Sequence, residues 1–240
     1  MDSENRMSVR PALIPLALAL ALLAAGCSDT HPTAVQQPTA PGPHFLRWAG
    51  SVPPQFRAVD GLSGRGGDGA FFADGPGGLS LNQVTATFWA VRGEQRSVQI
   101  NYLSATGDTS APFLRLSIAD PIYVPGRGDV APGDSVLITI TIDTVNIGVS
   151  LEPTGLRFGD PAQLQIWYAG AGGDLNGDGV VDSTDARIES RLLGMWYREG
   201  ADSQWTPIPA AQSLPDKSFM SELLHFCDFE VSFSEYAVSW

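Results

Sequence analysis

Cysteine is scarce in this sequence, which has only Cys27 and Cys227 among its 240 residues. A folded domain with so few cysteines has no disulfide framework and must rely on its apolar core and on any metal ion that it binds. Histidine is scarce too: there are three, and only His225 lies after residue 44. A hydrolase triad needs a nucleophile, a base and an orienting acid, and the chain contains no GxSxG motif, so the sequence gives little support to that chemistry.

Basic residues are outnumbered, with 14 Lys and Arg against 26 Asp and Glu, for a net charge of -12. The first 26 residues hold two bases and two acids, so 12 bases, 24 acids and the same net charge remain without them. An acidic chain is repelled by phosphates and by anionic lipid surfaces. The composition therefore argues against nucleic acid as a partner and against adhesion to membranes by charge.

Long apolar runs are absent except for one, Ala12 to Ala25, which at about 14 residues is too short to span a bilayer. Arg6 and Arg10 precede it, and the pattern is typical of a signal peptide over residues 1–26. The run ends in LLAAGC, which resembles the lipobox of bacterial lipoproteins. The resemblance implies cleavage before Cys27, a lipid on that cysteine, and a membrane-anchored protein outside the cytoplasm. With Cys27 lipidated, no intrachain disulfide can form.

Residues 27–44 are rich in Pro, Thr, Gln and Ala and have almost no large apolar side chains. Such a segment cannot pack a core, so we expect a disordered tether that holds a domain of residues 45–240 away from the lipid. In enteric lipoproteins an Asp directly after the lipidated cysteine favours retention in the inner membrane. Ser28 at that position implies the outer membrane of a cell envelope rather than the inner.

The stretch DLNGDGVVDSTD, residues 174–185, is the most informative in the chain. Its spacing matches an EF-hand calcium loop, with oxygen side chains at loop positions 1, 3, 5, 9 and 12, a carbonyl at position 7 and Gly179 at the sharp turn of position 6. The alternative is an acidic, solvated surface turn. Four carboxylates this close repel one another unless a cation lies among them, so the sequence predicts calcium as the cofactor. The predicted ligands are Asp174, Asn176, Asp178, the carbonyl of Val180, Asp182 and Asp185.

The loop differs from a sensor EF-hand in three respects. Position 12 is Asp185 rather than Glu, which resembles the calcium loops of bacterial dockerin repeats. The preceding AGAGG, residues 169–173, is a poor helix former, so the entering helix is missing, whereas residues 183–193 can form a short exiting helix with Asp182 as its N-cap. The chain contains no second loop to pair with this one. We therefore expect a structural rather than a sensing site; a dockerin-like role in docking a cohesin is the weaker alternative.

Short runs of alternating apolar and polar residues, separated by Gly- and Pro-rich turns, fill the chain from residue 84 onward. This pattern predicts a mainly β fold, an antiparallel β-sandwich with one short helix after a calcium-loop insertion at residues 170–193. We expect the first two runs to form a hairpin, and turns at EPTG and FGDP. The expected strands are residues 84–91, 97–103, 113–119, 135–143, 146–152, 162–168, 193–199, 218–226 and 230–238.

Three of these segments resemble the β-sandwich domain shared by ankyrins and netrin receptors: LEPTGLRFGDPAQLQIWY, WTPIP at residues 205–209 and SFSEYAV at residues 232–238. The resemblance covers residues 113–238 and implies the same sandwich. The calcium loop would then be inserted between the strands at residues 162–168 and 193–199. An ion there would pin a long hairpin connection.

Some members of that domain class cut themselves at a His-Phe-Ser tripeptide, in which the serine attacks the preceding peptide bond. Here Ser232-Phe233-Ser234 aligns but lacks the His, and His225-Phe226-Cys227 has the His but comes seven residues early. The sequence therefore predicts a non-catalytic protein, with an envelope enzyme or a self-cleaving domain as the minor alternative.

The six tryptophans raise the possibility of glycan binding, but most lie inside expected strands, where core packing is the simpler role. Trp48 and Trp240 lie near the ends of the domain and are the two that we expect to be exposed. The sequence thus predicts a lipid-anchored structural or interaction module with a protein or glycan partner. The six are Trp48, Trp89, Trp167, Trp196, Trp205 and Trp240.

Overall fold

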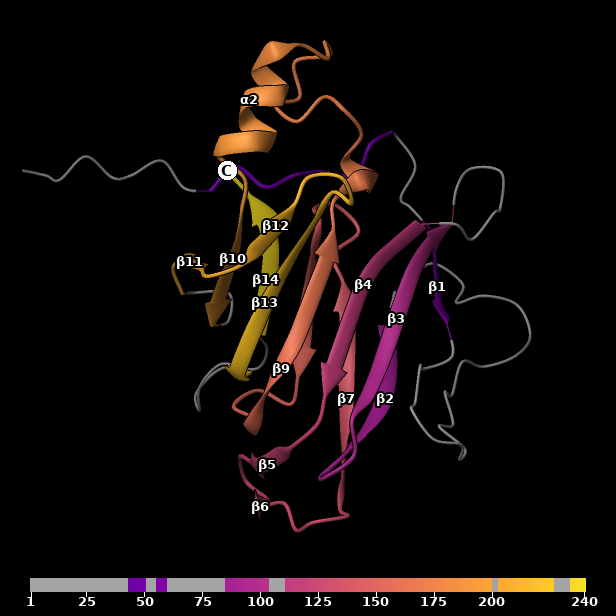
Figure 1. Cartoon of the computed structure of the whole chain (residues 1–240), viewed down its shortest axis with the longest axis vertical. Coiled ribbons are helices and arrows are strands. Elements are labelled where there is room, and N and C mark those ends of the chain that lie inside the picture. The colour runs from indigo at the N-terminus through magenta and orange to yellow at the C-terminus, as the bar shows by residue number, and fades with distance from the viewer. Residues whose placement is uncertain (1–42, 51–54, 60–84, 104–110, 200–202, 227–233) are drawn as a thin grey trace, which may run out of the picture. The chain divides into compact units, whose positions relative to one another are not determined.

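The alternating pattern folds into two antiparallel β-sheets packed face to face (Figure 1). The computed structural model describes residues 43–50, 55–59, 85–103, 111–199, 203–226 and 234–240. These all belong to one unit, Gly42–Trp240. Its elements are β1 (Gln55–Val59), β2 (Thr85–Val91), β3 (Arg96–Leu103), β4 (Ala111–Ile118), β5 (Pro121–Val124), β6 (Gly128–Asp129), β7 (Ser135–Ile142), β8 (Gly148–Glu152), β9 (Arg157–Trp167), the 3-10 helix η1 (Ala169–Ala171), α2 (Ser183–Arg191), β10 (Gly194–Glu199), β11 (Thr206–Ile208), β12 (Ala211–Ser213), β13 (Ser218–His225) and β14 (Ser234–Ser239).

The first sheet has eight strands in the order β1-β3-β4-β9-β13-β12, with β5 attached to β9 and β6 to β5. The second has six, in the order β11-β10-β14-β8-β7-β2. The predicted β-sandwich is therefore confirmed. Within the described ranges α2 is the one α-helix, at the position where a short helix was expected.

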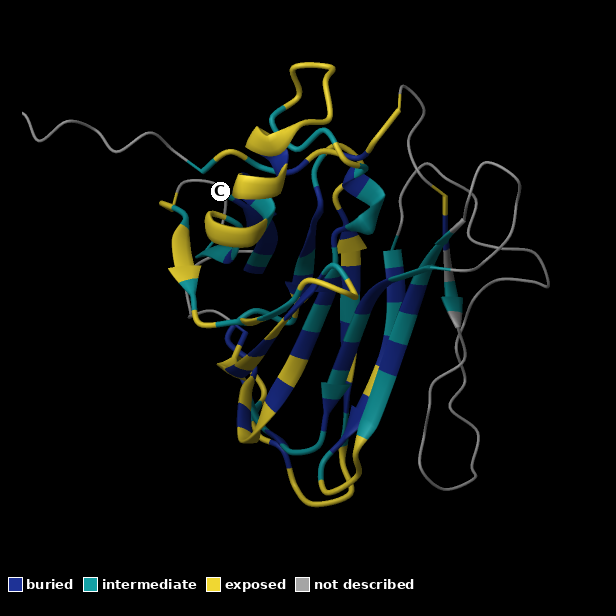
Figure 2. Cartoon of the chain, turned by 45° about the horizontal axis from the view of Figure 1, so that its top comes forward, coloured by how far each residue is buried: buried dark blue, intermediate teal, exposed yellow. Residues whose placement is uncertain are grey.

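Strand β7 illustrates why this sequence forms a sandwich. Val136, Ile138, Ile140 and Ile142 alternate with residues that face the solvent, and all four are buried, as the period of two requires. Figure 2 shows buried residues alternating with intermediate or exposed ones along the other long strands. Burying each such side chain contributes about 1.5–3 kcal/mol.

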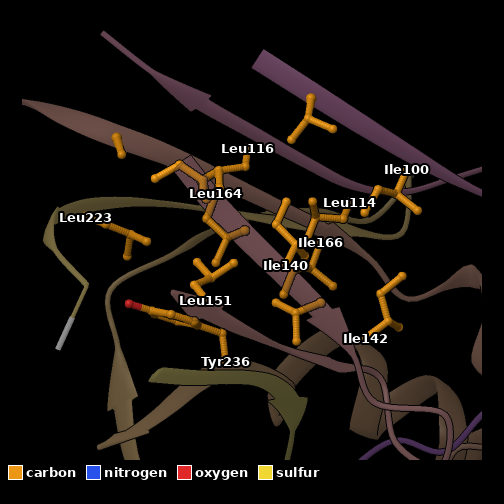
Figure 3. Packing of buried hydrophobic residues seen from close by; sticks show 14 of the residues in the cluster. Ile100, Leu114, Leu116, Ile140, Ile142, Leu151, Leu164, Ile166, Leu223 and Tyr236 are labelled. Carbon is orange, nitrogen blue, oxygen red and sulfur yellow. The ribbon is translucent and has the colours of Figure 1, made fainter. Parts of the chain in front are cut away.

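The core lies between the two sheets (Figure 3). Apolar side chains of β3, β4 and β9 face those of β7, β8 and β14, and nearly all are inaccessible to solvent. The residues labelled in Figure 3 are Ile100, Leu114, Leu116, Ile140, Ile142, Leu151, Leu164, Ile166, Leu223 and Tyr236.

The hairpin expected from the first two runs is wrong. Strand β2 pairs with β7 in the six-stranded sheet, whereas β3 pairs with β1 and β4 in the other sheet. The RGEQR connection therefore crosses from one sheet to the other. Arg92 fixes this crossing, because its guanidinium Nε lies 3.1 Å from Asp120 Oδ1 and its backbone N–H donates to the carbonyl of Asp134 at 2.9 Å. Alternation shows that a run is a strand but does not identify the neighbouring strand.

The turn expected at FGDP is wrong as well, because β9 runs without interruption from Arg157 to Trp167. Its ladder partner changes within this stretch, from β5 at Phe158 to β4 beginning at Gln163. Pro161 lies between the two ladders, at a position where strand pairing needs no backbone N–H. The strand therefore tolerates a residue that has none. The turn at EPTG, by contrast, is confirmed between β8 and β9.

Residues 43–48 run beside the end of β14. The backbone N–H of His44 donates to the carbonyl of Trp240 at 2.9 Å, and that of Leu46 donates to Val238 at 3.1 Å. Leu46 and Trp48 are buried, so Arg47 between them faces the other way. Residues 43 and 44, the last two of the predicted tether, are therefore part of the sandwich together with the segment that follows them.

Candidate functional site

The predicted calcium loop lies at one end of the sandwich, between η1 and α2 (Figure 1). It connects β9 to β10, which belong to different sheets. The expectation of a hairpin connection is therefore wrong. Both sides of β9 are already occupied, by β4 and β13, so the chain must cross to the other sheet to find a free edge.

Asp174, at loop position 1, closes the first turn of the loop. Its Oδ1 accepts hydrogen bonds from the backbone N–H groups of Gly177 at 2.8 Å and Asp178 at 3.2 Å, and its Oδ2 accepts one from Gly179 at 2.8 Å. Gly179 has a φ of 87°, a conformation that glycine adopts at little cost. The sharp turn predicted at position 6 is therefore confirmed.

Asn176 and Asp178, at positions 3 and 5, are paired with each other. The Nδ2 of Asn176 donates to Asp178 Oδ2 at 2.9 Å, and its Oδ1 accepts from the Asp178 N–H at 3.0 Å. The other oxygen of Asp178 accepts from the Val180 N–H at 2.8 Å. Val180 is 58% exposed, so its side chain packs little and its position is set by the backbone.

Asp182 and Asp185 form the start of α2. The Oδ1 of Asp182 accepts from the N–H of Thr184 at 2.6 Å, and Asp185 Oδ2 accepts from the N–H of Asp182 at 2.9 Å, which is a reciprocal capping box. Asp182 is thus the N-cap, as predicted. The helix ends at Arg191, two residues before the expected end.

Asp185 is also buried, at 3% exposure, and reaches back to the start of the loop. Its Oδ1 accepts from the N–H groups of Leu175 at 2.8 Å and Asn176 at 3.3 Å. The hydrogen bond from Asp182, followed by those from Leu175 and Asn176, holds the pKa of the Asp185 carboxyl below its usual value despite the opposing effect of desolvation. The Asp185 carboxylate, at loop position 12, is therefore hydrogen-bonded to the backbone of loop positions 2, 3 and 9.

The donor chemistry fits calcium. All the predicted ligand atoms are carboxylate, amide or carbonyl oxygens, which Ca²⁺ prefers. Oδ1 of Asp174 and Oδ1 of Asp185 each accept two N–H groups, but Oδ2 of each residue accepts one and keeps a second lone pair for a cation. In the part of the chain that the structure describes, no three His, Cys, Asp or Glu side chains converge as metal ligands. The calcium prediction therefore rests on the donor types and their spacing.

The base of the loop is packed against the N-terminal segment of the domain. A Cβ at Gly170 would overlap the ring of Trp48, and one at Gly172 would lie 3.2 Å from the Cβ of Ala49. The N–H of Ala49 donates to the carbonyl of Gly170 at 2.9 Å. The indole of Trp48 donates to the carbonyl of Asp143 at 2.9 Å, so both segments are held to the sandwich.

A cavity of about 750 Å³ lies between this N-terminal segment and the loop. Its lining includes His44, Arg47, Asn146, Asp174, Asn176 and Trp240. The rings of His44 and Trp240 are stacked, with centroids 4.6 Å apart. Sequence reasoning missed this site because its walls come from segments a hundred residues or more apart. The alternation of Leu46, Arg47 and Trp48 is a local signal of the N-terminal wall.

The expectation that most tryptophans pack in the core is wrong. Of the six only Trp48 is buried, packed on Phe56 and Phe113, and it is one of the two that were expected to be exposed. Trp89 is 41% exposed, because Phe88 and Ala90 take the inward positions of β2. A run that is apolar on both faces does not reveal which face is buried.

Of the tripeptides considered for self-cleavage, His225 is exposed at the end of β13, and Ser234 is buried at the start of β14. Cys227, Ser232 and Phe233 lie outside the described residues, as do Cys27 and the predicted signal peptide. No helix in the described ranges is long and apolar enough to cross a membrane.

No known protein family, no curated protein and no solved structure matches this chain.

Proposed function

We propose that this chain is a non-catalytic, lipid-anchored protein of the cell envelope whose β-sandwich is stabilised by one calcium ion. The loop carries the proposal, since it combines oxygen donors at positions 1, 3, 5, 7, 9 and 12 with a positive φ at Gly179 and a capped helix directly after it. The ligands are Asp174, Asn176, Asp178, the Val180 carbonyl, Asp182 and Asp185.

The ion has a structural role in this proposal. Bound calcium neutralises the carboxylates of the loop and ties the connection between the two sheets into a fixed arrangement. Binding to the folded chain alone adds its free energy to the stability of the fold. The sandwich has an extensive core of its own, so the ion adds to its stability and does not create the fold.

Anchoring follows from the N-terminal sequence. Residues 1–26 direct export, Cys27 carries the lipid, and the residues from there to 42 serve as the tether. Oxygen-rich calcium sites of modest affinity suit extracytoplasmic proteins, since dissociation constants of extracellular modules reach about 10⁻⁴–10⁻³ M. The outer membrane is the proposed location.

Calorimetric titration tests the calcium site. The full-length chain, purified in detergent and stripped of divalent ions, is titrated with calcium and with magnesium. We expect heat of association with calcium at millimolar levels or below, and loss of that heat in Asp174→Asn. Asp160→Asn, at an exposed aspartate of β9, is the matched control and should behave as the unaltered chain. Absence of any heat with the unaltered chain overturns the proposal.

Mass spectrometry tests the anchor. The chain expressed with its own N-terminus in a bacterial host should begin at Cys27 and carry the added mass of acyl groups. Cys27→Ser should abolish both the added mass and the partition into detergent. A chain that keeps residues 1–26, or that loses them without gaining a lipid, contradicts the anchor but leaves the calcium site untouched.

A further inference from the structure

The cavity beside the calcium loop has the size and chemistry of a ligand site. Its volume of about 750 Å³ lies within the range of small-molecule pockets, roughly 300–1,000 Å³. One wall is the segment from His44 to Gly50, and the facing wall is the first half of the calcium loop. Asn146 and Trp240 complete it.

The N-terminal wall supplies a cation and an amide. Arg47 forms an antiparallel bridge with Asn146, and such paired residues present their side chains on the same face of a ladder. Arg47 is exposed, and within the described part of the chain it has no ion-pair partner. A guanidinium beside an amide suits a carboxylate with neighbouring hydroxyl groups.

An aromatic surface lies on the same wall. The rings of His44 and Trp240 are stacked at an interplanar angle of 17°, and their backbones are hydrogen-bonded in both directions, at 2.9 and 3.2 Å. The pair is therefore held in place before any ligand arrives, which lowers the entropic cost of binding. Because the two rings cover each other on one side, each leaves its outer face, on which the apolar face of a pyranose ring can pack.

The charge of the facing wall depends on the ion. Asp174 is the one acidic residue that lines the cavity, and it is also position 1 of the calcium loop. With calcium bound, the charge of the Asp174 carboxylate is offset, so that this wall opposes an anion at Arg47 less strongly. Without calcium, the carboxylate opposes the charge of Arg47.

From these walls we infer that the cavity binds an acidic saccharide, a hexuronate chain, in a calcium-dependent manner. The Arg47 guanidinium pairs with the sugar carboxylate, and the pyranose ring packs on the outer face of one ring of the His44–Trp240 pair. The Asn146 amide, one N–H of which donates to Asp143 Oδ2 at 2.8 Å, has a second N–H for a hydroxyl oxygen. The inference rests on the proposed calcium site. It adds a saccharide ligand, its location in the cavity and its dependence on calcium to what was proposed above.

The test is a calorimetric titration of the full-length chain with the trisaccharide of β-1,4-linked glucuronic acid, in calcium and in EDTA. Cellotriose, which has the same backbone without carboxylates, is the matched ligand. The saccharide is also titrated into calcium buffer without protein, because uronates themselves bind calcium. We expect the uronate to bind in calcium. Cellotriose in calcium, and the uronate in EDTA, should each bind at least about tenfold more weakly. A tenfold loss of affinity is the size expected for one lost charge-assisted hydrogen bond.

Variants locate the binding in the cavity. Arg47→Gln and Trp240→Ala should each weaken uronate binding about tenfold or more, whereas Arg187→Gln on α2 and Trp89→Ala on β2 should not change it. Arg47 is exposed, so Arg47→Gln remains a fair test even if Trp240→Ala does not fold. Equal binding of cellotriose, binding that persists in EDTA, or an unaffected Arg47→Gln overturns the inference.

The two proposals fail separately. Heat with calcium but none with the uronate overturns the saccharide site and leaves the calcium site standing. No heat with calcium overturns both.

Discussion

The carboxylate of Asp185 accepts a hydrogen bond of 2.8 Å from the backbone N–H of Leu175, ten residues earlier in the chain. This bond closes the calcium loop on itself, since Asp185 is in the first turn of α2 and Leu175 is the second residue of the loop. Leu175 in turn packs its side chain against the core. The loop is therefore organised by its own position 12 and fastened to the sandwich by an apolar residue.

Removing this carboxylate should destabilise the loop even when calcium is absent. In Asp185→Ala three backbone donors, those of Leu175, Asn176 and Asp182, lose their acceptor, whereas Asp185→Asn keeps one oxygen for them. We expect the melting temperature in EDTA to fall in the order wild type, Asn, Ala, measured by circular dichroism. Asp178→Ala, at an exposed position of the same loop, is the control and should change the value in EDTA least. Equal melting temperatures in EDTA for wild type and Asp185→Ala would show that the hydrogen bonds to the Asp185 carboxylate contribute nothing to stability.

Gly170→Ala should lower stability, because the added Cβ would overlap the ring of Trp48. Overpacking of this kind typically costs about 1–3 kcal/mol. Gly194→Ala is the matched control: its Cβ would meet nothing nearer than 3.9 Å, so the substitution should be close to neutral. Urea unfolding followed by tryptophan fluorescence measures both. The prediction fails if the two variants unfold at the same urea concentration.

Trp48→Phe should separate the indole hydrogen bond from the packing of the ring. A phenyl ring retains contact with Phe56 and Phe113, but the carbonyl of Asp143 loses its donor at 2.9 Å. The loss of one hydrogen bond to a partly buried acceptor costs about 0.5–1.5 kcal/mol, to which the smaller ring adds a packing defect. Urea unfolding is the measurement, with Trp89→Phe, at an exposed position of β2, as the control that should remain unchanged.

The sequence predicted the elements of this fold better than their neighbours. Residues 136–142 alternate so regularly that the sequence alone predicts the strand β7 and its buried face. The N-cap at Asp182 follows from the spacing of the calcium loop. Sheet membership did not follow: only four residues join β2 to β3, yet the two strands lie in opposite sheets, and the crossing is held by contacts such as Arg92 with Asp120. Such contacts join segments about thirty residues apart, which local periodicity cannot identify.

The candidate site likewise has one part that the sequence predicted and one part that it did not. The oxygen donors of the loop are visible in the sequence because they occupy one short segment, whereas the cavity is built by pairing Arg47 with Asn146 and His44 with Trp240. Trp48 illustrates the difficulty at one residue, since its burial depends on Gly170 having no side chain. Nothing in the spacing of either residue indicates that contact.

Stability should also fall at alkaline pH because of Tyr168. This tyrosine is buried, at 1% exposure. The pKa of its hydroxyl is raised from 10.0 to about 12, and burial is the largest cause. The hydrogen bond from Gln212 lowers the pKa, and nearby Glu189 raises it further. The folded chain therefore holds this proton more tightly than the unfolded chain. The associated stability is fully present below about pH 10 and is lost as the pH rises through about 12.

Two pKa units correspond to about 2–3 kcal/mol, so wild-type stability should fall by an amount of that order across this window. Tyr168→Phe should remove this part of the pH dependence. It should cost little at neutral pH, because Gln212 keeps its 2.8 Å hydrogen bond to the Glu189 carbonyl. Urea unfolding at about pH 8 and about pH 11, midway through the window, should show about half of this fall, with Tyr123→Phe on β5 as the control at a half-exposed tyrosine. If wild type and Tyr168→Phe lose stability in parallel between the two pH values, the buried hydroxyl is not the group that titrates.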